Sequence, residues 1–223
     1  MINKIKGAIF DMDGTLIDSL ILWEVIWKSL GEKFSPDGKL NVSSESDRKV
    51  RTMTLLGAMQ YIHKEYSLGN SPEELLEEVD RIMFDFYKNQ VKTKKGVIEF
   101  LDYCLERGIK ACIASATDVS LLKVAIERCS LGKYFCEILS CADIGKGKDC
   151  PDIYFKALEV LGTSLEETCI FEDACVAIET AKKAGFMAVG IFDKNNYGQD
   201  KIKAMADVYI GEGETLLKMK EKK

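Results

Sequence analysis

The segment Asp11-Met12-Asp13-Gly14-Thr15 is the first place in this sequence where residue types and spacing could do chemistry. A tight turn would account for Asp13 and Gly14, since Asp and Gly dominate such turns. It would not account for Asp11, because a carboxylate at the end of a buried apolar strand costs free energy unless a cation or hydrogen-bond donors compensate it. Two carboxylates at this spacing could hold a cation, act as a nucleophile or transfer a proton.

Further polar residues follow other short apolar runs. Ser115 ends the second run, Lys148 follows the third after a short loop, and Glu172-Asp173 ends the fourth. In an open parallel sheet the carboxyl ends of the strands form the ligand crevice, so these side chains should meet Asp11 and Asp13 there. Each pair of carboxylates brought within several ångströms repels by about 4 kcal/mol at an effective dielectric of 20. The cluster therefore requires a cation, and its oxygen ligands favour Mg²⁺ over zinc or copper.

The elements that must position these residues alternate along the chain. Short apolar runs, typical of strands buried on both faces, lie at 5–10, 109–114, 138–140, 169–171, 187–192 and 208–210. Segments of helical period separate most of them, at 119–129, 153–161 and 176–184. This alternation predicts an α/β fold with a Rossmann-like parallel sheet core and helices on both faces.

The alternation fails between the first two strands, where about a hundred residues intervene. Ser71-Pro72-Glu73-Glu74 begins a helix there, with Ser as N-cap and Pro at the first helical position, and apolar residues recur at helical spacing from Leu75 to Phe86. We therefore predict an inserted all-helical domain over 17–92, and a catalytic core made of 1–16 and 93–223.

Composition excludes several classes of function. The 31 basic and 36 acidic residues give a net charge of −5, which argues against nucleic acid or anionic membrane as a partner. No stretch approaches the roughly 20 apolar residues of a membrane span, and no secretion signal is visible, so we expect a cytoplasmic protein. Its eight cysteines include no Cys-x-x-Cys pair, which favours reduced thiols over a zinc site. We expect a monomer or a weak dimer.

Taken in order, these motifs resemble those of the haloacid dehalogenase (HAD) superfamily, in its phosphatase and phosphomutase branch with a helical cap inserted after the first motif. The resemblance covers nearly the whole chain. It implies that Asp11 is the nucleophile and Asp13 the general acid and base. Ser115 and Lys148 match the family's hydroxyl and lysine motifs, and Glu172-Asp173 match its acidic metal-binding pair.

The resemblance implies a Mg²⁺-dependent phosphatase that hydrolyses a small phosphorylated metabolite through an aspartyl phosphate. The metal would be held by Asp11, the backbone carbonyl of Asp13 and Asp173, with Glu172 acting through metal-bound water. The residues expected to bind the substrate are Gly14, Thr15, Ser115, Ala116, Lys148 and, in the helical insertion, Arg51.

The sequence departs from the family pattern in two loops. The lysine motif often continues Pro-x-Pro-Asp, and here Asp149 replaces the first proline while Pro151 and Asp152 remain. The acidic motif usually continues with Ser and then Gly, where this chain has Ala174 and Ala177.

Two alternative functions are open. A sugar phosphomutase resembling β-phosphoglucomutase would carry a cap-hinge histidine and a Val after the Asp-Gly pair, where this chain has Trp23 and Thr15, so hydrolysis is favoured. A non-catalytic phosphate-binding protein is less favoured because the full catalytic set is present. The second Asp also disfavours a phosphonatase, and the second Asp together with the acidic pair disfavours a dehalogenase.

Other polar and aromatic residues have simpler interpretations. The only histidine, His63, is expected to be structural, and Gly145-Lys146-Gly147-Lys148 lacks the Ser or Thr of a nucleotide phosphate loop. We expect core packing for Trp23 and Trp27, and a solvated charge run for Lys92, Lys94 and Lys95.

Overall fold

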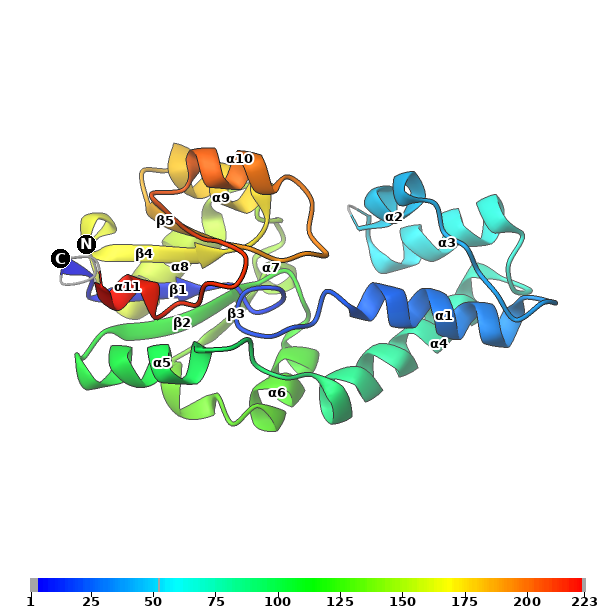
Figure 1. Ribbon diagram of the computed structural model, residues 1–223, viewed down its shortest axis with the longest axis horizontal. Coiled ribbons are helices and arrows are strands. Elements are labelled where there is room, and N and C mark those ends of the chain that lie inside the picture. Colours follow the sequence, from blue (N-terminus) through cyan, green and yellow to red (C-terminus); the bar gives the residue numbers. More distant parts are fainter. Residues whose placement is uncertain (1–3, 52, 222–223) are drawn as a thin grey trace. The chain divides into compact units, whose positions relative to one another are not determined.

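Six parallel strands form a single sheet in the computed structural model, which describes residues 4–51 and 53–221 (Figure 1). The strand order is β3-β2-β1-β4-β5-β6. Their bounds are β1 Gly7–Phe10, β2 Lys110–Ser115, β3 Ile138–Ser140, β4 Thr168–Glu172, β5 Met187–Ile191 and β6 Val208–Ile210. The predicted α/β class is confirmed. Because β1 lies between β2 and β4, the chain order reverses beside β1, where such sheets bind ligands.

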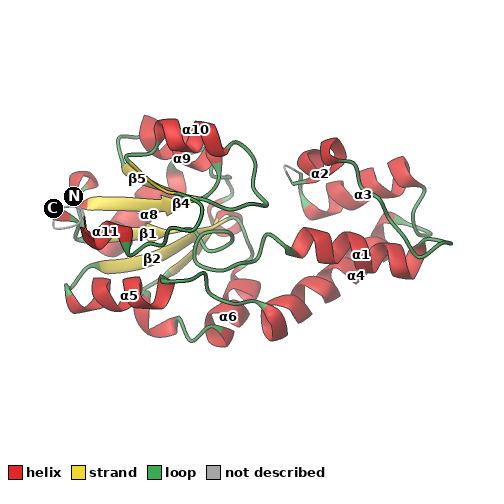
Figure 2. Cartoon of the chain, viewed as in Figure 1, coloured by secondary structure: helices red, strands yellow, loops and turns green. Residues whose placement is uncertain are grey.

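Helices cover both faces of the sheet (Figure 2). Side chains of the central strands alternate between these two helical layers. Ile9 and Ile170 belong to the core cluster packed against α8, α9 and α10. Phe10 and Phe171 face the other side, where their rings stack 4.4 Å apart and contact Phe100 of α5. The α-helices that follow residue 90 are α5 Val97–Glu106, α6 Val119–Arg128, α7 Cys141–Ile144, α8 Asp152–Leu161, α9 Cys175–Lys183, α10 Gln199–Met205 and α11 Lys218–Glu221.

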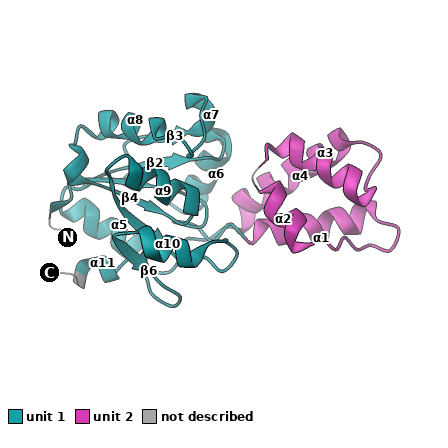
Figure 3. Ribbon diagram, turned by 90° about the horizontal axis from the view of Figure 1, so that it is seen from above, with its two compact units in different colours: residues 1–20, 91–223 teal, residues 21–90 magenta. Residues whose placement is uncertain are grey.

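The chain divides into two compact units (Figure 3), one comprising residues 1–20 and 91–223 and the other Ile21–Gln90. The second unit is helical, with α1 Leu22–Phe34, α2 Ser44–Val50, α3 Leu55–Tyr66 and α4 Pro72–Asp85, which continues as a π-helical turn over Phe86–Gln90. The segment 17–92 expected from the sequence contains this whole unit and a few residues of the core at each end. As expected, Ser71 is the N-cap of α4, and its side chain accepts the backbone N–H of Glu74 at 3.2 Å.

The segments that leave and re-enter the core pair with each other. Ile17 and Thr93 form an antiparallel bridge. On either side of this bridge, the backbone N–H of Asp18 donates to the carbonyl of Lys92 at 2.9 Å. The backbone N–H of Lys94 donates to the carbonyl of Leu16, also at 2.9 Å. The core is therefore continuous across the base of the insertion.

The cysteines are free thiols, as expected. Cys104, Cys112, Cys141 and Cys169 are buried, and burial raises the pKa of Cys104 to about 12. Of the helices in residues 4–51 and 53–221, none combines the length and apolar character needed to cross a membrane.

Candidate active site

A buried ion-pair network lies at the carboxyl ends of β1 and β4. Asp11 directly follows β1, and Glu172 is the last residue of β4. Lys148, in the loop between α7 and α8, donates from Nζ to a carboxylate oxygen of Asp11 and, at 2.6 Å, to Oε2 of Glu172. Three residues predicted from separate motifs are thus in direct contact.

The acidic residues here form a potential metal site. Asp11, Glu172 and Asp173 are buried, and each offers a carboxylate oxygen within 4.8 Å of the others. When all three carboxylates are ionised, the Lys148 ammonium leaves an excess of two negative charges. Oxygen donors so arranged suit a hard divalent cation, and Mg²⁺ fits this donor set.

The pKa values in the cluster reflect burial first and the charges of neighbouring groups second. Burial, reinforced by the negative charge of Glu172, raises the pKa of Asp11 well above its usual range, although Lys148 opposes the shift. Burial and Glu172 likewise raise the pKa of Asp173 to about 7. Burial alone would lower the pKa of Lys148, but the charges of Asp11 and Glu172 raise it well above its usual range. A cation bound to the carboxylates would relieve their repulsion.

Gly14 brings the loop after β1 against Asp173. Its φ of +77° lies in the region that favours glycine, and a Cβ at this position would overlap the Asp173 carboxylate. The next residue, Thr15, is buried and donates from Oγ1 to Oδ1 of Asp173 at 3.2 Å. Both residues, predicted as substrate contacts, therefore adjoin the acidic cluster.

The carboxylate of Asp13 accepts hydrogen bonds from two hydroxyls. Ser19 Oγ donates to its Oδ1, and Thr117 Oγ1 donates to its Oδ2, both at 2.7 Å. The backbone N–H of Thr117 also donates to Oγ of the buried Ser115 at 3.1 Å. Thr117 thus connects Asp13 with the end of β2, while Ala116 is exposed in the turn before α6. A metal contact by the Asp13 carbonyl stays a prediction.

The loop after β4 keeps a defined geometry despite its departure from the family pattern. The backbone N–H of Ala174 donates to Oε1 of Glu172 at 3.2 Å. Since a backbone group makes this contact, the side chain at position 174 is not needed for it.

Two contacts near Asp173 were not predicted. Lys94, expected in a solvated charge run, is only 18% exposed and pairs with Oδ2 of the buried Asp193 at 2.7 Å. The solvated interpretation was wrong for Lys94, because it took no account of a buried acid far away in the sequence, whereas Lys92 and Lys95 are exposed as expected. Asn196, which no motif singled out, donates from Nδ2 to Oδ2 of Asp173 at 2.6 Å.

The remaining predicted contact, Arg51, belongs to the helical unit. Its Nε donates to Asp47 Oδ2 at 2.8 Å, and its guanidinium lies 5.7 Å from the ring centre of Trp23. Trp27 is buried as expected, and its indole N–H donates to Oδ1 of Asp47 at 2.8 Å. His63 has a structural contact, between Nδ1 and the carbonyl of Leu68 at 2.8 Å.

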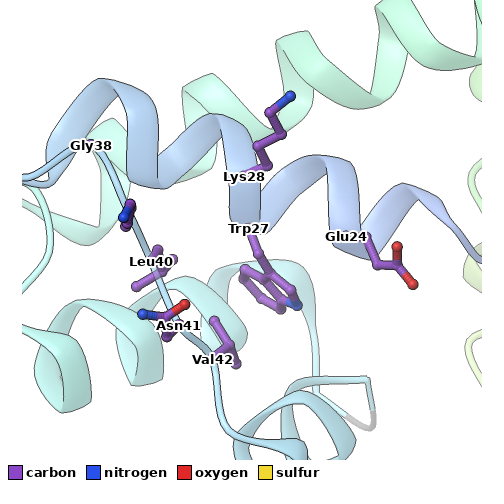
Figure 4. A pocket seen from close by; sticks show the side chains of 8 residues that line it. Glu24, Trp27, Lys28, Gly38, Leu40, Asn41 and Val42 are labelled. Carbon is purple, nitrogen blue, oxygen red and sulfur yellow. The ribbon is translucent and has the colours of Figure 1, made fainter.

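The helical unit also contains a pocket of about 420 Å³ (Figure 4). Its lining comes from α1 and the following loop: Glu24, Trp27, Lys28, Gly38, Lys39, Leu40, Asn41 and Val42. None of these was predicted to take part in chemistry.

Comparison with known proteins identifies the class. The chain matches the haloacid dehalogenase-like hydrolase family over residues 8–191, and it belongs to that family. It is 28% identical over 221 residues to a phosphorylated carbohydrates phosphatase of Thermotoga maritima, a match that covers 97% of this chain and 99% of the relative.

The chain is also similar to a second named phosphatase and to a solved structure. The chain is 26% identical to hexitol phosphatase B of Escherichia coli, with 93% of this chain and 92% of the relative covered. A solved structure of a β-phosphoglucomutase candidate from Thermotoga maritima superposes with a TM-score of 0.78 at 25% identity, covering 92% of this chain and 94% of that one. The family resemblance of the sequence motifs is thereby confirmed, and the chain is a hydrolase with sugar-phosphate phosphatases among its homologues.

Proposed function

We propose that this protein is a Mg²⁺-dependent phosphatase that hydrolyses a small phosphorylated metabolite through an aspartyl phosphate. The observation that carries the proposal is the buried arrangement of Asp11 beside Lys148, with Glu172 and Asp173 completing a set of oxygen donors within 4.8 Å. A nucleophilic carboxylate, a buried cation and a cation-binding acidic group are the parts that phosphoryl transfer to a side chain requires.

In the first step, a carboxylate oxygen of Asp11 attacks phosphorus, and the bond between phosphorus and the leaving oxygen breaks. Asp13 donates its proton to that oxygen, so the product departs as an alcohol. In the second step, Asp13 takes a proton from water while the water oxygen attacks phosphorus. The bond to Asp11 then breaks, which releases inorganic phosphate and restores the Asp11 carboxylate and the protonated form of Asp13.

Other residues hold the phosphoryl group and its charge. Lys148 and Ser115 donate to phosphoryl oxygens, together with groups of Gly14, Thr15 and Ala116. Mg²⁺, when held by Asp11, the Asp13 carbonyl and Asp173, with Glu172 acting through a bound water, supplies electrostatic stabilisation of the phosphoryl charge.

The helical unit Ile21–Gln90 is assigned as the cap domain, which would select the substrate and include Arg51 among its contacts. A phosphorylated sugar or sugar alcohol is the favoured substrate class, because two relatives similar over more than 90% of this chain are named phosphatases of phosphorylated carbohydrates and of hexitol.

The test is phosphate release from a panel of phosphorylated sugars, sugar alcohols and other small metabolites, with and without Mg²⁺. We expect turnover of at least one sugar phosphate, its loss on exhaustive chelation and its return with Mg²⁺. Full activity after chelation, or turnover retained without the Asp11 carboxylate, would refute the proposal.

A sugar phosphomutase is the second candidate, favoured by the similarity to a β-phosphoglucomutase candidate. Incubation with β-glucose 1-phosphate and a trace of the bisphosphate distinguishes a phosphatase from a mutase. We expect little or no glucose 6-phosphate, because Trp23 stands near the family's cap-hinge histidine. Efficient conversion would assign the mutase instead.

A further inference from the structure

The loop that joins β5 to α10 reaches back to the acidic cluster through Asn196. The side-chain nitrogen Nδ2 donates twice to Asp173, at 2.6 Å to Oδ2 and at 2.9 Å to the backbone carbonyl. The side-chain oxygen of Asn196 accepts the backbone N–H of Tyr197 at 2.8 Å. The amide orientation therefore satisfies all three partners at once, with the nitrogen toward two acceptors and the oxygen toward a donor.

Asp173 is consequently held at both carboxylate oxygens. Thr15 donates to Oδ1 from the loop after β1, and Asn196 donates to Oδ2 from the loop after β5. Two donors from separate segments restrict rotation of the carboxylate about its side-chain bonds. Partners of this kind orient metal ligands, and their loss commonly weakens metal binding by about 10- to 100-fold.

The loop that carries Asn196 is itself anchored inside the core. Asp193 is buried, and its carboxylate pairs with Lys94 Nζ at 2.7 Å and accepts the N–H of Asn195 at 2.8 Å. The Asp193 carbonyl accepts the N–H of Asn196 at 3.1 Å and the side-chain amide of Gln199 at 3.1 Å.

Lys94 also contacts the backbone of this loop. Its ammonium donates to the Phe192 carbonyl at 3.1 Å, and its side chain lines a cavity of about 50 Å³ together with Thr15. The Lys94–Asp193 ion pair thus joins the segment that returns from the insertion to the loop after β5. It does so beside Thr15, the other residue that donates to Asp173.

We propose that Asn196 is a positioning residue for Asp173, and that the Lys94–Asp193 ion pair fixes the loop from which it acts. The inference rests on the proposed function in one respect, the assignment of Asp173 as a Mg²⁺ ligand. Asn196 would act through Asp173 and would touch neither metal nor substrate. It reduces the conformational freedom that Asp173 would otherwise lose when the ion binds, so its contribution is to Mg²⁺ affinity.

The test compares Mg²⁺ binding by the wild-type protein, Asn196→Ala and the matched control Lys194→Ala, which removes an exposed side chain of the same loop. Calorimetric titration gives the Kd for Mg²⁺, and the Tm in EDTA reports the stability of the metal-free protein. We expect the Kd to rise about 10- to 100-fold in Asn196→Ala. Lys194→Ala should stay within about twofold of wild type, and the metal-free Tm should change little in either variant.

A second variant and a kinetic measurement keep the test independent of that one substitution. Asp193→Asn retains Asn196 but weakens its anchor, so it should raise the Kd by less than Asn196→Ala does. In phosphatase assays, the kcat of Asn196→Ala at saturating Mg²⁺ should return close to the wild-type value, while the Mg²⁺ concentration for half-maximal activity stays raised.

Three results would overturn the inference. The first is an unchanged Mg²⁺ Kd in Asn196→Ala, and the second is equal weakening in Asn196→Ala and Lys194→Ala. The third is a kcat of Asn196→Ala that excess Mg²⁺ leaves low. Failure of the wild-type protein to bind Mg²⁺ is a separate outcome, because it refutes the metal site of the proposed function and the role of Asn196 with it.

Discussion

Carboxylates are buried in both compact units, with opposite consequences for their charge. In the core, burial raises the pKa of Asp11 far above its usual range. In the helical unit, Glu78 of α4 is only 5% exposed, yet hydrogen bonds and charges from Arg81 and Lys33 lower its pKa to about 2. The core has one bonded lysine for its three clustered carboxylates, whereas Glu78 has two cations to itself.

This difference separates a stabilising interaction from a candidate metal site. Glu78 and its cations hold α4 against Lys33 of α1, so their favourable energy contributes to folding. The core cluster retains unbalanced negative charge, which costs stability in the metal-free protein and would supply affinity for a cation. Substitutions in the two units should therefore affect different properties.

The largest effect should follow Asp11→Asn. Turnover should fall by about 10⁴-fold or more, because the amide preserves the shape but removes the proposed nucleophile. The metal-free Tm should stay the same or rise, since one of the repelling charges is gone. Phosphate release and thermal unfolding in EDTA measure the two effects, and near-normal turnover would contradict the assignment.

Asp13→Asn should be the next most damaging change, with a loss of about 10²- to 10⁴-fold on alkyl phosphates. Aryl phosphates with good leaving groups need no proton at the departing oxygen, so the first step should be slowed less for them. Rapid-mixing measurement of alcohol or phenol release separates that step from water attack. An equal loss with both substrate types would exclude Asp13 as the acid.

Lys148→Ala should reduce kcat/KM by about 10²- to 10³-fold, and Ser115→Ala by less, because a lost buried cation leaves the phosphoryl charge less balanced than a lost neutral donor. Lys148→Ala also leaves Asp11 and Glu172 without their shared cation, so the metal-free protein should lose stability. Kinetics of the two variants at saturating Mg²⁺ make the comparison. The reverse order of damage would show that Lys148 lies away from the phosphate.

The smallest effect should come from Glu78→Gln, which should lower the free energy of unfolding at pH 7 by about 1–2 kcal/mol. The pKa of Glu78 is lowered in the folded state, so its contribution is present above the unfolded pKa near 4.5 and is lost as the pH falls toward 2. Urea unfolding followed from pH 7 to pH 2 should show the variant and wild type converging. Glu77→Gln, at an exposed position of the same helix, should have no such effect, and a pH-independent difference would argue against the ion pairs.

The sequence was most informative where strands end. Asp11, Glu172 and Asp173 follow buried apolar runs directly, so the parallel sheet brings them to one edge and their proximity could be predicted. Lys148 was found through the family's motif order. The positions of these residues in the site could be predicted from the order of elements along the chain alone.

Residues whose roles depend on the course of a loop could not be predicted in this way. Ser19, Thr117 and Asn196 contact Asp13 or Asp173 across 6, 104 and 23 positions of the sequence, and none carries a periodic or motif signal. Lys94 was misjudged for the same reason, because its partner Asp193 lies 99 positions away and a lysine-rich run is usually solvated.

The paired segments at the base of the insertion have a consequence for how the sheet folds and how it tolerates change. The bridge between Ile17 and Thr93 holds the two ends of the inserted segment together. For the pairing of the core strands, the insertion is therefore a closed loop. Closure entropy grows only with the logarithm of loop length, by about 0.6 kcal/mol for each doubling. Helical segments of quite different length could therefore replace Ile21–Gln90 at little cost to the pairing of β1 with β2. In this architecture the helical unit can diversify while the register that places Asp11 stays fixed.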